Sequence, residues 1–158
     1  MPRISDIAVL DQPRQFTLCV RTQTSVHKLP ELIGDSYRRM SDHLIDLNHY
    51  LADVPFVHFH NLDLRQPNMQ NLEVEIGFPV IATLPGKADI QPSILPAQRV
   101  IFCMYLGPYR DMEPVYEEMI QWVANKGRRS AGNGYEYHYN SSQHPANELL
   151  TKVVMPVG

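Results

Sequence analysis

Two glutamates on one expected strand are the side chains in this sequence best suited to bind a charged small molecule. Residues 72–80 alternate between apolar side chains and the set Glu73, Glu75 and Gly77, so both carboxylates are expected on one face. A carboxylate among aromatic rings attracts a cation through its charge and through the ring quadrupoles. The same alternation is also typical of a one-sided sheet whose glutamates face water. A cation site and a solvated face therefore both stay open.

The second group of candidate ligand-binding residues is aromatic. Tyr135, Tyr137 and Tyr139 alternate along one expected strand, so they share a face, and each buried hydroxyl would need a partner. Tyrosine is also common in strands for packing reasons alone, so a pocket and simple packing both remain open. Trp122 lies on a helical stripe, where core packing is the better interpretation.

The expected central strand, residues 100–106, is apolar on both faces. We expect its even-numbered residues to face the helices. Its odd-numbered residues then lie on the face of Glu75: Ile101, Cys103 and Tyr105. Tyr109 follows the strand break at Gly107-Pro108 and is expected close to the same face.

His58 and His60 lie two residues apart on an expected strand, so both rings could reach one metal ion. No third ligand stands at a telling spacing, and a pair of surface histidines is favoured, with no metal site. The sequence contains no glycine-rich phosphate loop, no nucleophile elbow and no CxxC pair. We therefore expect no cofactor, and a non-catalytic binding protein is favoured over an enzyme.

The elements that must position these residues form two similar series. Each series has two strands, an amphipathic helix and two more strands. The repeated part begins at the second strand of each series, with repeat 1 at about 14–82 and repeat 2 at about 97–158. The first helix is expected over 29–51, with Pro30 in its first turn, and the second is expected after Asp111, its expected cap. A short strand is expected at 7–10, a weak edge strand at 90–95, and a turn at 132–134. The fold class is α+β, within one domain spanning 1–158.

Composition limits the functions that the chain can have. Its 158 residues are 44% apolar and 20% charged, which suits one globular domain, and the formal net charge is −3. A nucleic-acid partner usually needs a basic face, so no direct nucleic-acid binding is expected. No signal peptide and no apolar run of membrane-spanning length occurs, so a cytoplasmic location without membrane contact is expected. Cys19 and Cys103 lie in equivalent strands and are expected to be reduced, buried thiols.

Several short motifs, in their order and spacing, resemble the GyrI-like small-molecule-binding domain. They are Glu-Val-Glu-Ile-Gly-Phe-Pro-Val at 73–80, Leu-Pro-Ala at 95–97, Gly-Pro-Tyr at 107–109, Tyr-Glu-Tyr at 135–137 and Leu-Thr-Lys-Val-Val-Met-Pro-Val at 150–157. This family provides the effector-binding domain of many AraC- and MerR-type multidrug-responsive regulators of bacteria, and it also occurs as a free-standing protein. The resemblance covers nearly the whole chain.

The resemblance implies a duplicated β-α-β-β module with a curved antiparallel sheet, two main helices and a pocket at the pseudo-twofold axis. It implies ligands that are often aromatic, lipophilic cations, held by tyrosines and a buried glutamate. The resemblance itself points to Glu75, Tyr109 and Trp122. Together with the residues placed by the strand faces and with Lys152, the expected ligand-binding residues are Glu75, Tyr105, Tyr109, Trp122, Tyr137, Tyr139 and Lys152.

One departure from the family concerns charge. Where the family often has Thr-Glu-Ile near its end, this chain has Thr-Lys-Val at 151–153, and Lys152 is the repeat counterpart of Glu75. A pair between Lys152 and Glu75 would make the site neutral and would weaken selection for cations. Glu136 and Glu148 are further acidic candidates.

Three functions follow as hypotheses. The leading one is a free-standing module that binds small amphipathic molecules for sensing or sequestration, without a DNA-binding domain, since residues 1–15 are too few for one. The alternatives are a hydrolase of small electrophilic compounds that uses a pocket glutamate and aromatics, and a modulator of a protein partner such as gyrase. A homodimer through an edge strand is permitted by the pattern.

Overall fold

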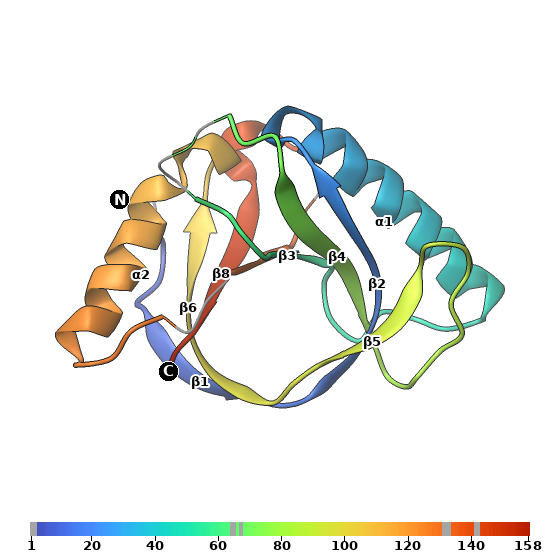
Figure 1. The fold of residues 1–158 in the computed structure, drawn as a ribbon, viewed down its shortest axis with the longest axis horizontal. Coiled ribbons are helices and arrows are strands. Elements are labelled where there is room, and N and C mark those ends of the chain that lie inside the picture. The colour runs from blue at the N-terminus through green and yellow to red at the C-terminus, as the bar shows by residue number, and fades with distance from the viewer. Residues whose placement is uncertain (1–2, 64–65, 67, 131–133, 141–142) are drawn as a thin grey trace. The chain divides into compact units, whose positions relative to one another are not determined.

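The structure is a computed structural model that describes residues 3–63, 66, 68–130, 134–140 and 143–158. Its strands are β1 (Ala8–Gln12), β2 (Gln15–Thr24), β3 (Phe56–Phe59), β4 (Leu72–Val80), β5 (Gln91–Leu95), β6 (Gln98–Leu106), β7 (Tyr135–His138) and β8 (Leu150–Pro156). The helices are α1 (Leu29–Asp46) and α2 (Glu113–Asn125), with short 3-10 turns η1 (Val26–Lys28), η2 (Tyr109–Asp111) and η3 (Ala146–Glu148) (Figure 1). The α+β class and the order of strands and helices are as predicted. The turn predicted at 132–134 lies outside the described residues except for Gly134.

The chain divides into two compact units, one formed by Arg14–Pro96 and the other by Met1–Pro13 with Ala97–Gly158. In the first unit the strands pair antiparallel in the order β5-β2-β4-β3, and in the second in the order β1-β6-β8-β7. The strand that precedes each repeat pairs with a strand of the other repeat: β1, before repeat 1, pairs with β6, and β5, before repeat 2, pairs with β2. The two units have the same strand order, built from the same succession of elements.

Helix α1 covers one face of the Arg14–Pro96 unit. Met40 and Leu44 of α1 are buried with the alternate β4 residues Val74, Ile76 and Phe78, which is the apolar row predicted from the sequence. Pro30 lies in the first turn of α1, where its missing N–H costs no hydrogen bond. The helix ends at Asp46, earlier than predicted, because the chain turns at Asn48, whose φ is 57°.

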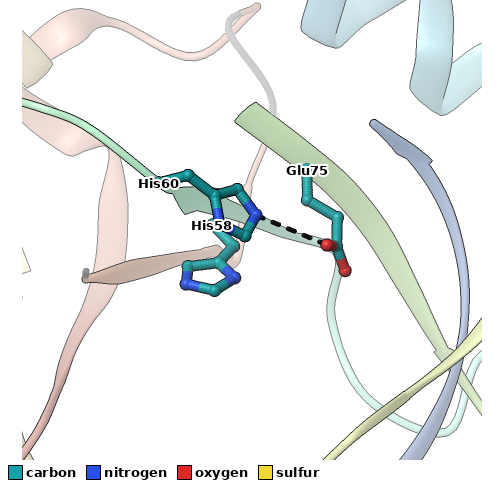
Figure 2. A group of neighbouring side chains, drawn as sticks. All are labelled: His58, His60 and Glu75. Atoms are coloured by element: carbon teal, nitrogen blue, oxygen red, sulfur yellow. Dashed lines mark ion pairs between the residues drawn. The ribbon is translucent and has the colours of Figure 1, made fainter. Parts of the chain in front are cut away.

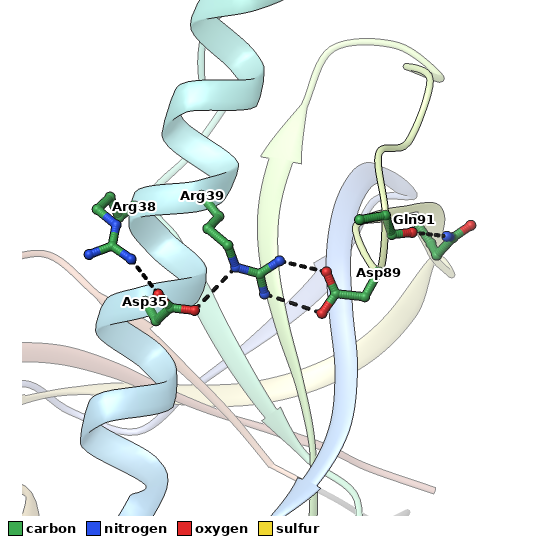
Figure 3. Close-up of polar contacts among 6 residues, drawn as sticks. Asp35, Arg38, Arg39, Asp89 and Gln91 are labelled. Carbon is green, nitrogen blue, oxygen red and sulfur yellow. Dashed lines mark hydrogen bonds and ion pairs between the residues drawn. The ribbon is translucent and has the colours of Figure 1, made fainter.

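The Arg39–Asp89 ion pair attaches α1 to the turn that precedes β5. Arg39 makes a bidentate contact with Asp89, with N–O distances of 2.6 and 3.2 Å, and its Nε lies 3.2 Å from Asp35 (Figure 3). Arg38 also pairs with Asp35, and Gln91 donates a hydrogen bond to the carbonyl of Ala88. Each exposed pair of this kind contributes at most about 1 kcal/mol, so the network orients the turn more than it stabilises the unit.

Helix α2 lies beside β6 in the other unit, and this contact corrects one prediction. Cys103 Sγ lies 3.9 Å from Met119 Sδ of α2, so the odd-numbered residues of β6 face the helix. The expectation that Ile101, Cys103 and Tyr105 share the face of a carboxylate was wrong, because both faces of β6 are apolar and alternation alone does not orient such a strand.

Smaller boundary differences have local causes. Strand β1 continues through Asp11 because that residue pairs with Arg99 of β6, with an Arg99 Nε–Asp11 Oδ1 distance of 2.8 Å. Asp111 does not cap α2; it lies in η2, and Met112 occupies the cap position without a side-chain hydrogen bond. No helix in the described part of the chain combines the length and apolar character that a membrane span requires.

Candidate functional site

A polar cluster of the Arg14–Pro96 unit lies on the face of its sheet that points away from α1. Glu75 alternates with the core residues of β4, and its ladder partners are His58 on β3 and Arg21 on β2. Only 9% of Glu75 is exposed, so the alternative of a fully solvated carboxylate does not hold. The register of the three strands thus places the Glu75 carboxylate between a histidine and an arginine on neighbouring strands.

His60 and His58 complete this cluster (Figure 2). His60 Nε2 lies 3.4 Å from Glu75 Oε1, and the His58 and His60 ring centroids are 4.1 Å apart. One ligand atom from each of the three residues lies within 4.8 Å of the other two. The sequence offered no third candidate near the two histidines; the structure brings Glu75 beside them from the next strand rather than from a nearby sequence position.

Burial sets the protonation of the neighbouring groups. The pKa of His58 is lowered to about 3, chiefly by burial and then by the charges of His60 and Arg21, so its ring is neutral near pH 7. The pKa of the Cys19 thiol is raised to about 12, chiefly by burial and then by the Glu75 carboxylate. Cys19 is therefore a protonated thiol beside Glu75. Cys19 and Cys103 are both free and buried, as predicted.

Phe56 lies over Gly77 on the same face as Glu75. A Cβ atom at position 77 would stand 2.3 Å from Phe56 Cζ, so only glycine admits the ring at this depth. Phe56 is fully buried and is the ladder partner of Gly77. Glycine in the family-like motif thus makes room for an aromatic ring two residues from the carboxylate.

The equivalent face of the other unit has the opposite charge. Tyr137 on β7 is the ladder partner of Lys152 on β8, at the positions that His58 and Glu75 occupy in the first unit. Lys152 Nζ lies 4.5 Å from the Tyr137 ring centroid and 6.0 Å from that of Phe102. An ammonium group over two rings is a cation–π arrangement, so the chain itself supplies a cation to this aromatic face.

The helix-facing side of β7 carries a separate buried acid. Tyr116 of α2 donates a hydrogen bond of 2.5 Å to Glu136, whose other carboxylate oxygen lies 3.6 Å from His138 Nε2. Burial, followed by the Glu136 charge, raises the pKa of Tyr116 well above its usual value. The Tyr109 ring lies 5.2 Å from the His138 ring. Glu136, one of the further acidic candidates from the sequence, thus lies under α2 and is hydrogen-bonded to Tyr116.

The remaining predicted residues fall in different surroundings. Tyr105 is buried on the α2 side of β6 and donates a 2.6 Å hydrogen bond to the Pro108 carbonyl. Trp122 lines a cavity of about 420 Å³ with residues of β1, β6 and α2, and Lys126 Nζ lies 5.2 Å from its ring. Tyr139, beyond the end of β7, is 41% exposed, and Glu148 is exposed in η3.

Comparison with known proteins identifies the kind of domain. A family model, described as the GyrI-like small molecule binding domain, matches residues 11–158. None of the curated proteins matches the chain in sequence. The structure is similar to the EcmrR C-terminal domain, with a TM-score of 0.74 and 17% identity over 98% of each chain.

Other solved structures have the same fold. EcmrR in its complex with DNA matches with a TM-score of 0.80 and 16% identity over 96% of this chain, which spans only 57% of the EcmrR chain. A hydrolase from Listeria innocua has a TM-score of 0.76 and 9% identity over 96% of this chain and 91% of its own. SAV2435 bound to tetraphenylphosphonium has a TM-score of 0.58 and 11% identity over 98% of this chain and 94% of its own. At such identities these likenesses concern the fold alone.

Proposed function

Because the chain belongs to the GyrI-like small-molecule-binding family, we propose that it is a binding module for small amphipathic molecules, with lipophilic aromatic cations as the preferred class. The observation that carries the proposal is the buried carboxylate of Glu75, on the sheet face that points away from α1 and that also carries the Phe56 ring over Gly77. A carboxylate in a poorly solvated, aromatic setting favours a cation that loses little hydration on binding. The structural neighbour solved with tetraphenylphosphonium supports the same ligand class.

The other predicted ligand-binding residues enter this proposal with unequal support. Tyr137 and Lys152 lie on the face equivalent to that of Glu75. Tyr139 is 41% exposed and therefore accessible to a ligand. Tyr109 is 40% exposed, but its ring lies 5.2 Å from that of His138 on the helix-facing side of β7, so it has less support. Tyr105 and Trp122 lie on the α2 side of their sheet, where the Pro108 carbonyl and Lys126 already contact them, so their part in binding is the least supported.

The test is calorimetric titration of the protein with tetraphenylphosphonium in a buffer that contains a metal chelator. We expect Glu75→Gln to weaken binding by roughly 10- to 150-fold, since a hydrogen-bonded charge contributes about 1.5–3 kcal/mol. Glu73→Gln is the matched control, because Glu73 lies two residues away on the same strand and bonds Gln23 in an exposed position. Equal affinities for the wild type and Glu75→Gln would remove Glu75 from the mechanism.

The second proposal is hydrolysis of small electrophilic compounds. It is favoured by the hydrolase among the structural neighbours and by the buried Tyr116–Glu136 pair, in which a carboxylate and a phenol share a short hydrogen bond. Incubating candidate electrophiles with the protein and following them by mass spectrometry separates the two functions. Loss of more than one equivalent of compound per chain would mean turnover, and Glu136→Gln should then stop it.

A further inference from the structure

The side chains of His58, His60 and Glu75 meet in a way that cation binding by Glu75 alone does not require. His58 and His60 alternate along β3 and its extension, so both rings lie on one face. The His60 N–H donates a 2.9 Å hydrogen bond to the Glu73 carbonyl, which continues the β3–β4 ladder past Phe59. The backbone of all three residues is therefore held by one hairpin, as Figure 2 shows.

The side-chain atoms of His60 and Glu75 lie close together but do not form a hydrogen bond. Among the described residues, the buried Nε2 of His60 has no hydrogen-bond partner, although Glu75 Oε1 lies 3.4 Å away. An unsatisfied buried polar atom is costly, and an ion between the two would satisfy both. Ligand atoms around a tetrahedral zinc ion, with bonds of about 2.0–2.2 Å, stand about 3.4 Å apart. The His60–Glu75 separation already has this value.

We propose that His58, His60 and Glu75 form a binding site for a divalent transition-metal ion, with zinc the best match. Two imidazoles and one carboxylate are a common zinc ligand set, and three protein ligands leave a coordination position open to water or a small molecule. The ligand atoms lie within 4.8 Å of one another, at most about 1.4 Å beyond the tetrahedral spacing, so a small shift of the His58 side chain completes the set. Imidazole ligands discriminate against magnesium and calcium, which prefer oxygen.

Two neighbours modify the site. The Cys19 thiol interacts with the Glu75 carboxylate from the neighbouring strand β2. Arg21, the ladder partner of Glu75 on β2, adds an opposing positive charge, but its side chain is exposed and screened by solvent. Glu75 is common to this site and to the proposed cation site, so the two occupants compete for one carboxylate.

The experiment is calorimetric titration of chelator-stripped protein with zinc chloride alone, in the absence of any organic cation. We expect one zinc ion per chain at micromolar or tighter affinity. His60→Asn and Glu75→Gln should each lower the affinity by at least about 100-fold, since the loss of even an outer hydrogen-bond partner costs 10–100-fold. His27→Asn is the matched control, because His27 is exposed in η1, outside the cluster, and should bind zinc as the wild type does.

A second measurement guards against variants that fail to fold. Wild-type protein loaded with cobalt(II) should show the visible bands of a tetrahedral site, and these bands should disappear on addition of zinc. A strong thiolate-to-cobalt band would overturn the ligand set in favour of Cys19. Absence of zinc binding by a folded wild type, or equal zinc affinity in folded His60→Asn, would overturn the site itself. Binding of the organic cation is measured in the presence of a chelator, and binding of zinc is measured without the organic cation. The zinc-site proposal and the cation-binding proposal can therefore each fail independently of the other.

Discussion

The two hairpins β3–β4 and β7–β8 have the same register but carry opposite charges. His58 faces Glu75 across the first ladder, and Tyr137 faces Lys152 across the second. The acidic hairpin gathers histidines around its carboxylate, whereas the basic hairpin places its ammonium group over aromatic rings. The two hairpins thus share the geometry of pairing, while the side chains form an anion-centred arrangement in one and a cation-centred arrangement in the other. Exchanging equivalent residues between the hairpins tests which of these differences matter.

The largest expected effect comes from Gly77, whose counterpart in the other hairpin is Val154. Gly77→Ala should lower the free energy of unfolding by about 1–3 kcal/mol, because the new methyl group meets the buried Phe56 ring at 2.3 Å. Gly34→Ala in α1 is the matched control. No atom lies within 4 Å of the added Cβ there, so it should stabilise the helix by about 0.5–1 kcal/mol. Denaturant unfolding measures the stability of both variants. A free energy of unfolding for Gly77→Ala equal to that of the wild type would show that the Phe56 ring can move aside.

A smaller effect is expected from Cys103, whose counterpart on β2 is Val20. Burial raises the pKa of the Cys103 thiol to about 11 from an ordinary value near 9. The thiol therefore contributes stability that is complete below pH 9 and is lost as the pH rises towards 11, about 2 kcal/mol by pH 11. Cys103→Val should remove this part of the alkaline decline. Unfolding measured at pH 8 and pH 11 checks it; identical declines in both proteins would contradict it.

The smallest effect concerns Lys152, the counterpart of Glu75. Removing a positive charge from the chain lowers its repulsion of a bound cation, so Lys152→Gln should tighten tetraphenylphosphonium binding by less than tenfold, or about 1.4 kcal/mol. Lys126→Gln removes the same charge beside Trp122 and should change the affinity less. Weaker binding in Lys152→Gln would indicate that the aliphatic stem of Lys152 contacts the ligand.

Local periodicity predicted much of this fold. The alternation of 72–80 placed Val74, Ile76 and Phe78 against a helix because one face of that strand is wholly apolar. The same reasoning failed on β6, whose two faces are equally apolar, and Cys103 proved to face α2. It also assigned the two cysteines to equivalent strands without seeing that they differ by one position: Cys19 pairs with Gly77, and Cys103 with Val153, the counterpart of Ile76.

The sequence by itself determined the α+β class, the two series of strands and helices, the family and the polarity of the face that carries Glu75, because each depends on residue types at short, regular spacing. Only the tertiary structure decided which strands pair, as β1 does with β6 and β5 with β2, and which side chains meet. His60 and Glu75 are 15 positions apart in the chain, and their 3.4 Å contact follows from the hairpin register. Register is fixed by the packing of whole strands, so the spacing of two residues in the sequence does not reveal it.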